Sequence, residues 1–252
     1  MIRALACTLM IYAVTSCGSY IPDRTYSGSS TEEEFEGFEN NNSGTEELWS
    51  LEGWPVQELS TASQADFLNE VEQDVILYMN MARTDPFGFS SDFIEPRLRF
   101  FSGNDYMESD DATILITREG AAAVEECAQE MVDTPPMLKL IPSEGISMAS
   151  LDHAMDLSQS GESGHFGTDG SLFSERISRY GDWLRTVGEV ISFGPDTGRE
   201  IVITLLLDDG VQDRGHRRNI LNPRFKLVGV AIEEHPDYGY VCVIDFAGGF
   251  RE

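Results

Sequence analysis

The sequence predicts an α/β fold in which helices flank both faces of a mainly antiparallel sheet. Three segments, at 187–193, 226–233 and 238–247, are short and rich in β-branched residues, as strands are. Between and before them, apolar residues recur at helical spacing. The last two strands are separated only by a turn at Pro236-Asp237, so they are expected to pair antiparallel. Helices on both faces of such a sheet would bury its two apolar sides.

The first helix is expected to begin near residue 63. Its apolar side chains recur at helical spacing: Phe67, Val71, Val75, Tyr78 and Met79. Ser63 or Asp66 can cap its start, and Pro86 with Gly88 ends it. A polar stretch from Asp105 to Asp111 then predicts a loop insertion.

The later elements follow in order along the chain. Helices are expected at about 118–131, before Pro135-Pro136, and at about 145–160. A glycine-rich loop at 164–170 leads to a short helix that begins near Ser171. After the strand at 187–193, Gly194-Pro195 breaks the chain, and a helix from about Asp196 carries the apolar run 201–207.

The charge balance excludes one class of partner. The 252 residues include 17 Lys and Arg against 44 Asp and Glu, a formal net charge of −27. Such a surface repels phosphate backbones, so nucleic-acid binding is not expected. The sequence also contains no G-x-S-x-G, H-E-x-x-H, C-x-x-C or Walker A motif. The motifs that usually identify serine hydrolases, zincins, thioredoxin-like proteins and P-loop enzymes are therefore missing, and membership of these classes is not expected.

The N-terminus predicts export. Arg3 precedes a mostly apolar run from Ala4 to Val14 that is too short to span a bilayer, which is typical of a signal peptide over residues 1–16. The run Val14-Thr15-Ser16-Cys17-Gly18 resembles a bacterial lipobox, so Cys17 is expected to be lipidated and to anchor the protein at the cell surface. The alternative is an ordinary secretory signal cleaved near Ser16, with Cys17 incidental.

Residues 17–62 are expected to form an acidic, flexible tether, and residues 63–252 the folded domain. Acidic and Gly/Ser/Asn-rich runs in the tether bury too little apolar surface to offset the entropy of ordering. Trp49 and Trp54 interrupt it, so part of it could dock on the domain or on a partner.

The sequence contains four cysteines, of which two are available to form a disulfide within the folded domain. Cys7 lies in the signal peptide and Cys17 in the lipobox, which leaves Cys127 and Cys242. In an oxidising compartment these two could form a disulfide. The alternative is that both are buried thiols.

Two of the four histidines are candidate site residues. His165 and His216 each follow a glycine in a loop, and Glu189 interrupts an apolar strand, where a buried carboxylate needs a partner. These three could hold a divalent metal such as zinc, or they could form a hydrogen-bonded structural cluster. By contrast, His153 is expected on a helix face beside acidic neighbours, and His235, next to a turn proline, in solvent.

Several ordered motifs resemble those of the CAP superfamily, which comprises cysteine-rich secretory proteins, antigen 5 and pathogenesis-related 1 proteins and is also called the SCP domain. They are Gly164-His165-Phe166-Gly167-Thr168-Asp169-Gly170-Ser171, Arg176, Tyr180-Gly181, Gly188-Glu189, Asp208-Asp209-Gly210-Val211, Arg214-Gly215-His216-Arg217-Arg218-Asn219-Ile220-Leu221, Val228-Gly229-Val230 and Val241-Cys242-Val243-Ile244-Asp245-Phe246. The resemblance runs from about Asp66 to Phe250. It implies a three-layer α–β–α sandwich with a central cleft.

The resemblance also implies a site. In the family, two histidines and two acids often line the cleft and can hold a divalent cation. His165, Glu189 and His216 match three of those positions. The fourth is usually a glutamate, and here either Asp208 or Asp209 replaces it or the position is vacant.

The function expected from these observations is that of a non-enzymatic, surface-anchored binding module. Its partner would be a lipid or a protein, and the chain is expected to be a monomer. The alternative is a metal-assisted hydrolase that uses His165, Glu189 and His216.

Overall fold

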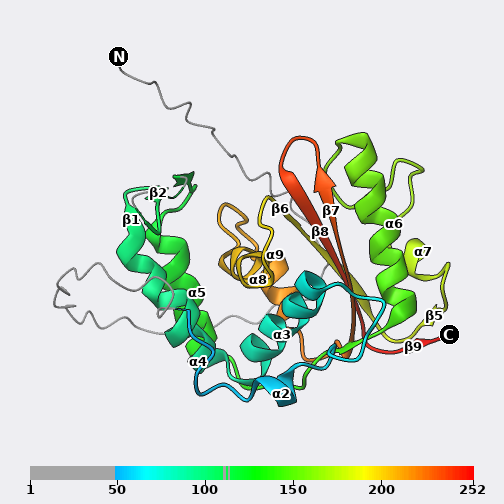
Figure 1. Cartoon of the computed structure of the whole chain (residues 1–252), viewed down its shortest axis with the longest axis horizontal. Coiled ribbons are helices and arrows are strands. Elements are labelled where there is room, and N and C mark those ends of the chain that lie inside the picture. Colours follow the sequence, from blue (N-terminus) through cyan, green and yellow to red (C-terminus); the bar gives the residue numbers. More distant parts are fainter. Residues whose placement is uncertain (1–48, 110–111, 113) are drawn as a thin grey trace.

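The structure is a computed structural model that describes residues 49–109, 112 and 114–252 (Figure 1). The segment predicted to be a signal peptide, the Cys17 predicted to be lipidated and the part of the predicted tether up to residue 48 lie outside the described residues. The central sheet has four strands in the order β4–β7–β8–β6. They are β4 (Ile141–Pro142), β7 (Leu227–His235), β8 (Gly239–Ala247) and β6 (Val187–Phe193).

The sheet is mainly antiparallel, as predicted. β8 pairs antiparallel with both β6 and β7, and only the short β4 runs parallel to β7. The strand expected at 187–193 has those bounds in the structure, and the turn at Pro236-Asp237 lies between β7 and β8.

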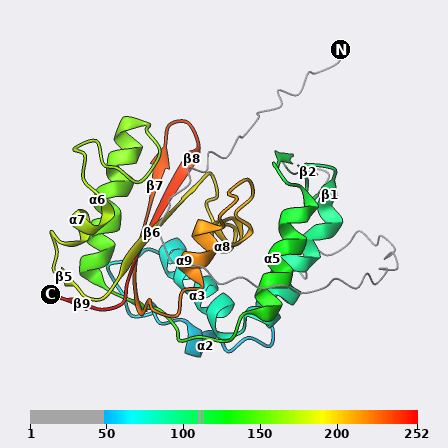
Figure 2. The same cartoon turned by 180° about the vertical axis from the view of Figure 1, so that it is seen from behind.

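Helices cover both faces of the sheet. Two of them, α6 (Glu144–Ser160) and α7 (Phe173–Ile177), lie on one side, whereas α3 (Glu70–Thr84), α8 (Gly198–Leu207) and α9 (Gly215–Ile220) lie on the other (Figures 1 and 2). On β6, Ile191 packs in the cluster that includes α6, and its neighbour Val190 packs in the cluster that includes α3 and α8. This alternation confirms the three-layer sandwich.

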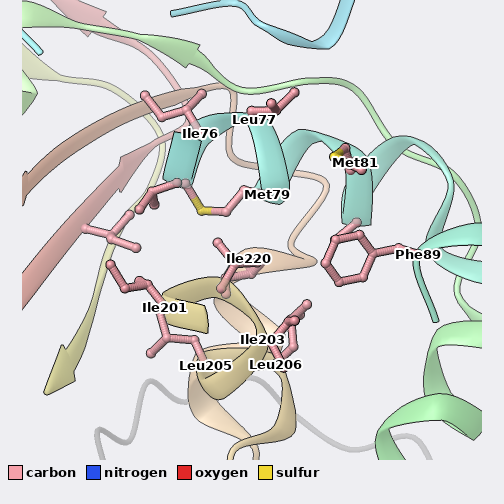
Figure 3. Packing of buried hydrophobic residues seen from close by; sticks show 14 of the residues in the cluster. Ile76, Leu77, Met79, Met81, Phe89, Ile201, Ile203, Leu205, Leu206 and Ile220 are labelled. Carbon is pink, nitrogen blue, oxygen red and sulfur yellow. The ribbon is translucent and has the colours of Figure 1, made fainter. Parts of the chain in front are cut away.

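The larger core lies between α3, α8, α9 and the sheet (Figure 3). Met79 of α3, Ile201 of α8 and Ile220 of α9 are fully buried in it. The near-continuous apolar sequence of α8 follows from this position, because the helix has neighbours on most sides.

The first long helix starts later than predicted. α3 begins at Glu70 because Asn69 and Glu72 form a capping box: Asn69 Oδ1 accepts from the Glu72 backbone N–H at 3.0 Å, and Glu72 Oε2 accepts from the Asn69 N–H at 2.8 Å. These two reciprocal bonds pair backbone N–H groups at the start of α3. The helix therefore begins at Glu70 and not directly after Ser63 or Asp66.

Residues 49–62, which were expected in the tether, pack against the domain. The side chains of Trp49, Leu59 and Ala62 are buried in the main core, and α2 (Val56–Leu59) forms here. Asn80 of α3 donates to Leu59 O at 3.0 Å. Docking on the domain, one of the two possibilities left open by Trp49 and Trp54, is therefore what this segment does, and the flexible tether does not extend through residues 49–62.

The insertion before residue 116 is more ordered than predicted. Its elements are α4 (Pro86–Phe89), a π-helical turn (Ser90–Ile94), a 3-10 turn (Glu95–Phe100), β1 (Phe101–Ser102), β2 (Asp105–Tyr106) and β3 (Leu115–Ile116). The three strands form a small antiparallel sheet, so the polar stretch from residue 105 is only partly a loop. The insertion precedes α5 (Ala121–Asp133) and lies at the end of the molecule away from α6 (Figure 2).

A further two-stranded pairing, β5 (Asp182–Trp183) with β9 (Phe250–Arg251), closes the C-terminal end. Within the described residues, no helix has the length and apolar character needed to cross a bilayer.

Candidate functional site

Glu189 lies on the α6-facing side of the sheet. It occupies the third position of β6, and Ile191, two residues later, packs beneath α6. Side chains two residues apart on a strand share a face, so Glu189 also points toward this layer. The residue is only 2% exposed, and the buried carboxylate must therefore find partners within the protein.

Both oxygens of Glu189 have such partners. His165 Nδ1 lies 2.8 Å from Oε1, and Arg176 Nη2 donates to Oε2 at 2.6 Å. Arg176 is itself 1% exposed and comes from α7. We call His165, Arg176 and Glu189 the α7 cluster. It is the first pairing of predicted site residues that the structure brings together, and Arg176 is a member that the site prediction did not include.

The loop that carries His165 is held by backbone contacts. Gly164 has φ +119°, a conformation that L side chains rarely adopt, and its carbonyl lies 2.9 Å from His153 Nε2. Arg176 also donates to His165 O at 3.2 Å. His153, on α6 beside Asp152 as predicted, is fully buried, and burial lowers its pKa. Its position explains how α6 orients the loop.

Asp208 and His216 form the second pairing. Asp208 ends α8 in the left-handed conformation, with φ 55°, and is 1% exposed. Its Oδ1 lies 2.5 Å from His216 Nδ1, and its Oδ2 accepts from the backbone N–H groups of His216 at 2.8 Å and Arg217 at 3.2 Å. Asp208 therefore ties the end of α8 to the start of α9. We call this pair the α9 knot.

Asp209, the other candidate for the fourth position, does not contribute to either pairing. Its oxygens accept from the backbone N–H groups of Arg118, at 2.6 Å, and Glu119, at 2.7 Å. It fixes the segment that leads into α5. Of the two adjacent acids, Asp208 is thus the one that partners a predicted site histidine.

The two pairings do not merge into one metal centre. Glu189 faces the layer of α6 and α7, whereas Asp208, which follows α8, and His216, on α9, belong to the helices on the other side of the sheet (Figure 1). Throughout the described parts of the chain, no three His, Cys, Asp or Glu side chains gather as metal ligands. The residues present do not fit the two-histidine, two-acid cation site that the family resemblance implies.

A second buried acid, Asp245, lies beside the α7 cluster. It stands directly opposite Glu189 in the pairing of β6 with β8 and is fully buried. Ser150 of α6 donates to its Oδ2 at 2.9 Å, whereas Oδ1 has no hydrogen-bond partner among the described residues. Burial first, and then the negative charge of Glu189, raises the pKa of Asp245 well above its ordinary value of 3.8. Like Glu189, Asp245 is an acid within an apolar strand, so the same sequence signal marks both residues.

We expect Asp245→Asn to flatten the pH dependence of stability. Because the folded-state pKa of Asp245 is raised, the folded chain holds a proton that the unfolded chain releases, so wild-type stability falls as the pH rises from about 4. The amide cannot ionise, so the variant should be at least as stable as wild type at pH 8, and its advantage should shrink toward pH 4. Urea unfolding at both pH values measures this, and a larger loss of stability for the variant at pH 8 than at pH 4 would contradict it.

The disulfide considered for Cys127 and Cys242 is not formed, and both are free, buried thiols. Cys127, on α5, donates to Leu206 O at 3.4 Å. Burial raises the pKa of Cys127 to about 12, so its thiol stays protonated at neutral pH. The buried-thiol alternative is therefore the one that the structure shows.

His235 was expected in solvent, and this is wrong. It is 3% exposed and packs against the rings of Phe193 and Tyr238, with centroid distances of 5.4 and 5.0 Å. Its Nε2 lies 3.1 Å from Glu162 O, and its Nδ1 accepts from the Asp237 N–H at 3.2 Å. The ring therefore anchors the β7–β8 turn to the end of α6.

Two solved structures resemble part of this chain. One is an extracellular protein containing an SCP domain from Bacillus anthracis, with 18% identity and a TM-score of 0.37 over 47% of this chain and 36% of that one. The other is an outer surface protein of Borrelia burgdorferi, with 16% identity and a TM-score of 0.39 over 49% of this chain and 86% of that one. The chain thus spans about a third of the length of the Bacillus protein. No curated protein matches it.

A protein-family model gives the classification. The model for the cysteine-rich secretory protein family, CAP, matches residues 121–246, which is half of the chain. The matched region runs from α5 to β8 and contains the α7 cluster, the α9 knot and the four-stranded sheet. The chain belongs to the CAP family.

Proposed function

We propose that this chain is a CAP-family module of the cell exterior that binds a lipid or protein partner without catalysing a reaction. In this proposal the α7 cluster and the α9 knot are structural. The observation that carries it is that both carboxylates are engaged by protein groups at both oxygens: Glu189 by His165 and Arg176, and Asp208 by the side chain and backbone of His216.

A metal ligand or a general base needs an available lone pair directed at the ion or the substrate. Freeing Glu189 for that role would leave the charge of Arg176 buried without its partner. Freeing Asp208 would remove an acceptor from two backbone N–H groups at the start of α9. Both changes cost free energy, which supports a structural role over the hydrolase alternative.

The exterior location is supported by the N-terminal sequence. Arg3, the apolar run that follows it and Cys17 in its lipobox-like context are typical of an exported, lipid-anchored protein. Mass spectrometry of the mature N-terminus tests the anchor. A lipidated Cys17 supports it, and an unmodified Cys17 or cleavage at another position would remove it.

Zinc and calcium titration calorimetry on the wild type tests the structural role of the site, together with a screen of generic ester and peptide substrates. We expect no saturable stoichiometric binding and no turnover. His216→Ala serves as the comparison, because it removes the ring paired with Asp208. Saturable zinc binding or sustained cleavage that disappears in this variant would favour the metal-assisted hydrolase instead.

A further inference from the structure

A groove opens along the free edge of β7, away from the α7 cluster and the α9 knot. Its wide part, about 510 Å³, is lined by Phe67, Pro142, Ser143, Glu144, Leu227, Phe250 and Glu252. A narrow slot of about 50 Å³ continues from it and shares Phe67 and Glu144. We call the two together the β7-edge groove.

The floor of the slot is the unpaired side of β7. Even-numbered residues of this strand direct their backbone groups away from β8: Val228 O accepts from Ser143 N at 2.9 Å, and Ile232 N donates to Glu72 Oε1 at 3.1 Å. Val230 lies between them and has the same orientation, because backbone direction alternates along a strand. β4 pairs only with residues 227 and 228 before the chain turns into α6. We find no partner for the outward N–H and C=O of Val230 among the described residues.

A buried hydroxyl faces the same slot. Ser147 of α6 lines it and is 6% exposed, and its Oγ has no hydrogen-bond partner among the described residues. Buried polar groups in native proteins are normally paired. The slot therefore presents a hydroxyl and a peptide group whose hydrogen bonds a bound ligand would complete. The slot has several times the volume of about 10–15 Å³ that one water needs, which is room for a peptide group.

The walls of the narrow slot are mainly apolar, and the wide part of the groove is acidic. Phe67 and Met148 flank the slot and are 38% and 42% exposed, so their flexible side chains can move aside. Glu144 and Glu252 are exposed at the wide part, and no Lys or Arg occurs among the described residues that line either part. The groove therefore favours a ligand with apolar side chains and positive charge.

We propose that the β7-edge groove binds an extended, basic segment of another polypeptide, whose backbone pairs with the sheet edge at Val230, between the occupied positions Val228 and Ile232. A peptide backbone supplies the donor and acceptor that Val230 and Ser147 lack, and alternate side chains of the bound strand reach the apolar walls. Lysine or arginine residues of the segment pair with Glu144 and Glu252. The proposal rests on the proposed binding function but uses a different part of the molecule from the two histidine–carboxylate pairs.

Fluorescence anisotropy with the full chain and a labelled heptapeptide of alternating lysine and valine tests the proposal. The main competing explanation is unspecific attraction to a chain with a net charge of −27. A second peptide of the same sequence, N-methylated at every backbone amide, keeps the charge but has no backbone N–H to donate to the edge. We expect it to bind about tenfold more weakly or worse. Equal binding of the two peptides would overturn the proposal.

Two sets of protein variants locate the site. Glu144→Gln with Glu252→Gln should weaken binding several-fold and flatten its decrease between about 0.05 and 0.3 M salt. The matched control is Glu125→Gln with Glu162→Gln, two exposed acids outside the groove, which should change the affinity less than about twofold. An equal effect of both pairs would mean that the peptide does not use the groove.

Ser147→Leu should fill the slot and abolish binding, with Met155→Leu on the exposed side of the same helix as its control. Circular dichroism and thermal melting establish whether each variant folds. A folded Ser147→Leu protein that binds the peptide normally would overturn the proposal. Metal titration and the hydrolysis screen bear only on the histidine–carboxylate pairs, so their outcome and that of the peptide experiments are independent.

Discussion

Replacing Arg83 with methionine is expected to lower the free energy of unfolding by about 3–5 kcal/mol. The guanidinium is fully buried on α3 and donates only to backbone carbonyls. Its acceptors are Leu138 O at 3.0 Å, Ile220 O at 2.5 Å, Asn222 O at 3.1 Å and Phe225 O at 3.1 Å. One side chain thus joins α3 to the segment before β4 and to the whole connection from α9 to β7.

The loss of stability in Arg83→Met is large because the buried carbonyls that accepted from the guanidinium lose their donor. Methionine fills much of the volume but donates no hydrogen bond, so several buried carbonyls lose their partner, and each loss costs about 1–3 kcal/mol. Burial lowers the pKa of Arg83 to about 10, so the side chain is still charged at neutral pH. Lysine should rescue little, because a single ammonium cannot reproduce the planar fork that reaches all four carbonyls.

Urea unfolding at neutral pH measures the change, with Arg218→Met as the control. Arg218 is exposed on α9 and forms only a surface pair with Asp213, so its replacement should cost less than about 1 kcal/mol. If the two variants lost similar stability, the proposed role of Arg83 would be wrong.

The second large effect is expected for Glu189→Gln, which should destabilise the fold by about 3–5 kcal/mol. Glutamine keeps the shape of the side chain but removes the negative charge, so the guanidinium of Arg176 remains buried and uncompensated. The loss is large because the desolvation of Arg176 persists while its ionic partner is gone.

A double variant separates the charge from the packing. Glu189→Leu combined with Arg176→Met removes both charges and should recover part of the stability that Glu189→Gln loses. Glu125→Gln, at an exposed position of α5, is the charge control and should be nearly neutral. A neutral Glu189→Gln variant would show that the α7 cluster contributes little to the fold.

The sequence predicted those parts of the fold that depend on local pattern. The β-branched run 187–193 is β6, and the turn at Pro236-Asp237 does join two antiparallel strands. The start of α3 was missed because Asn69 and Glu72 cap each other, a signal that lay within the sequence but competed with Ser63 and Asp66. The packing of Trp49 depends on Phe93, which follows 44 residues later, and spacing along the chain does not reveal such contacts.

The sequence predicted which residues pair in the candidate site better than it predicted how they are grouped in space. His165, Glu189, His216 and Asp208 all take part in histidine–carboxylate pairs, but the two pairs belong to layers on opposite sides of the sheet. Which face of the sheet a residue occupies follows from strand register and from the helix that covers it, neither of which a motif specifies. His235 was misplaced because its partners Phe193 and Glu162 come from other elements, whereas the neighbouring proline suggested an exposed turn.

The central claim is that the histidine–carboxylate pairs stabilise the fold without a metal, and zinc-dependent unfolding tests it most directly. The free energy of unfolding would be measured for the wild type and His216→Ala, each in EDTA and in excess zinc. We predict that zinc leaves the stability of both proteins unchanged, and that His216→Ala is less stable than wild type in either condition. A zinc-bound native site would instead stabilise the wild type by about 2.7 kcal/mol at a hundred times its dissociation constant. Such a gain, absent from His216→Ala, would contradict the account.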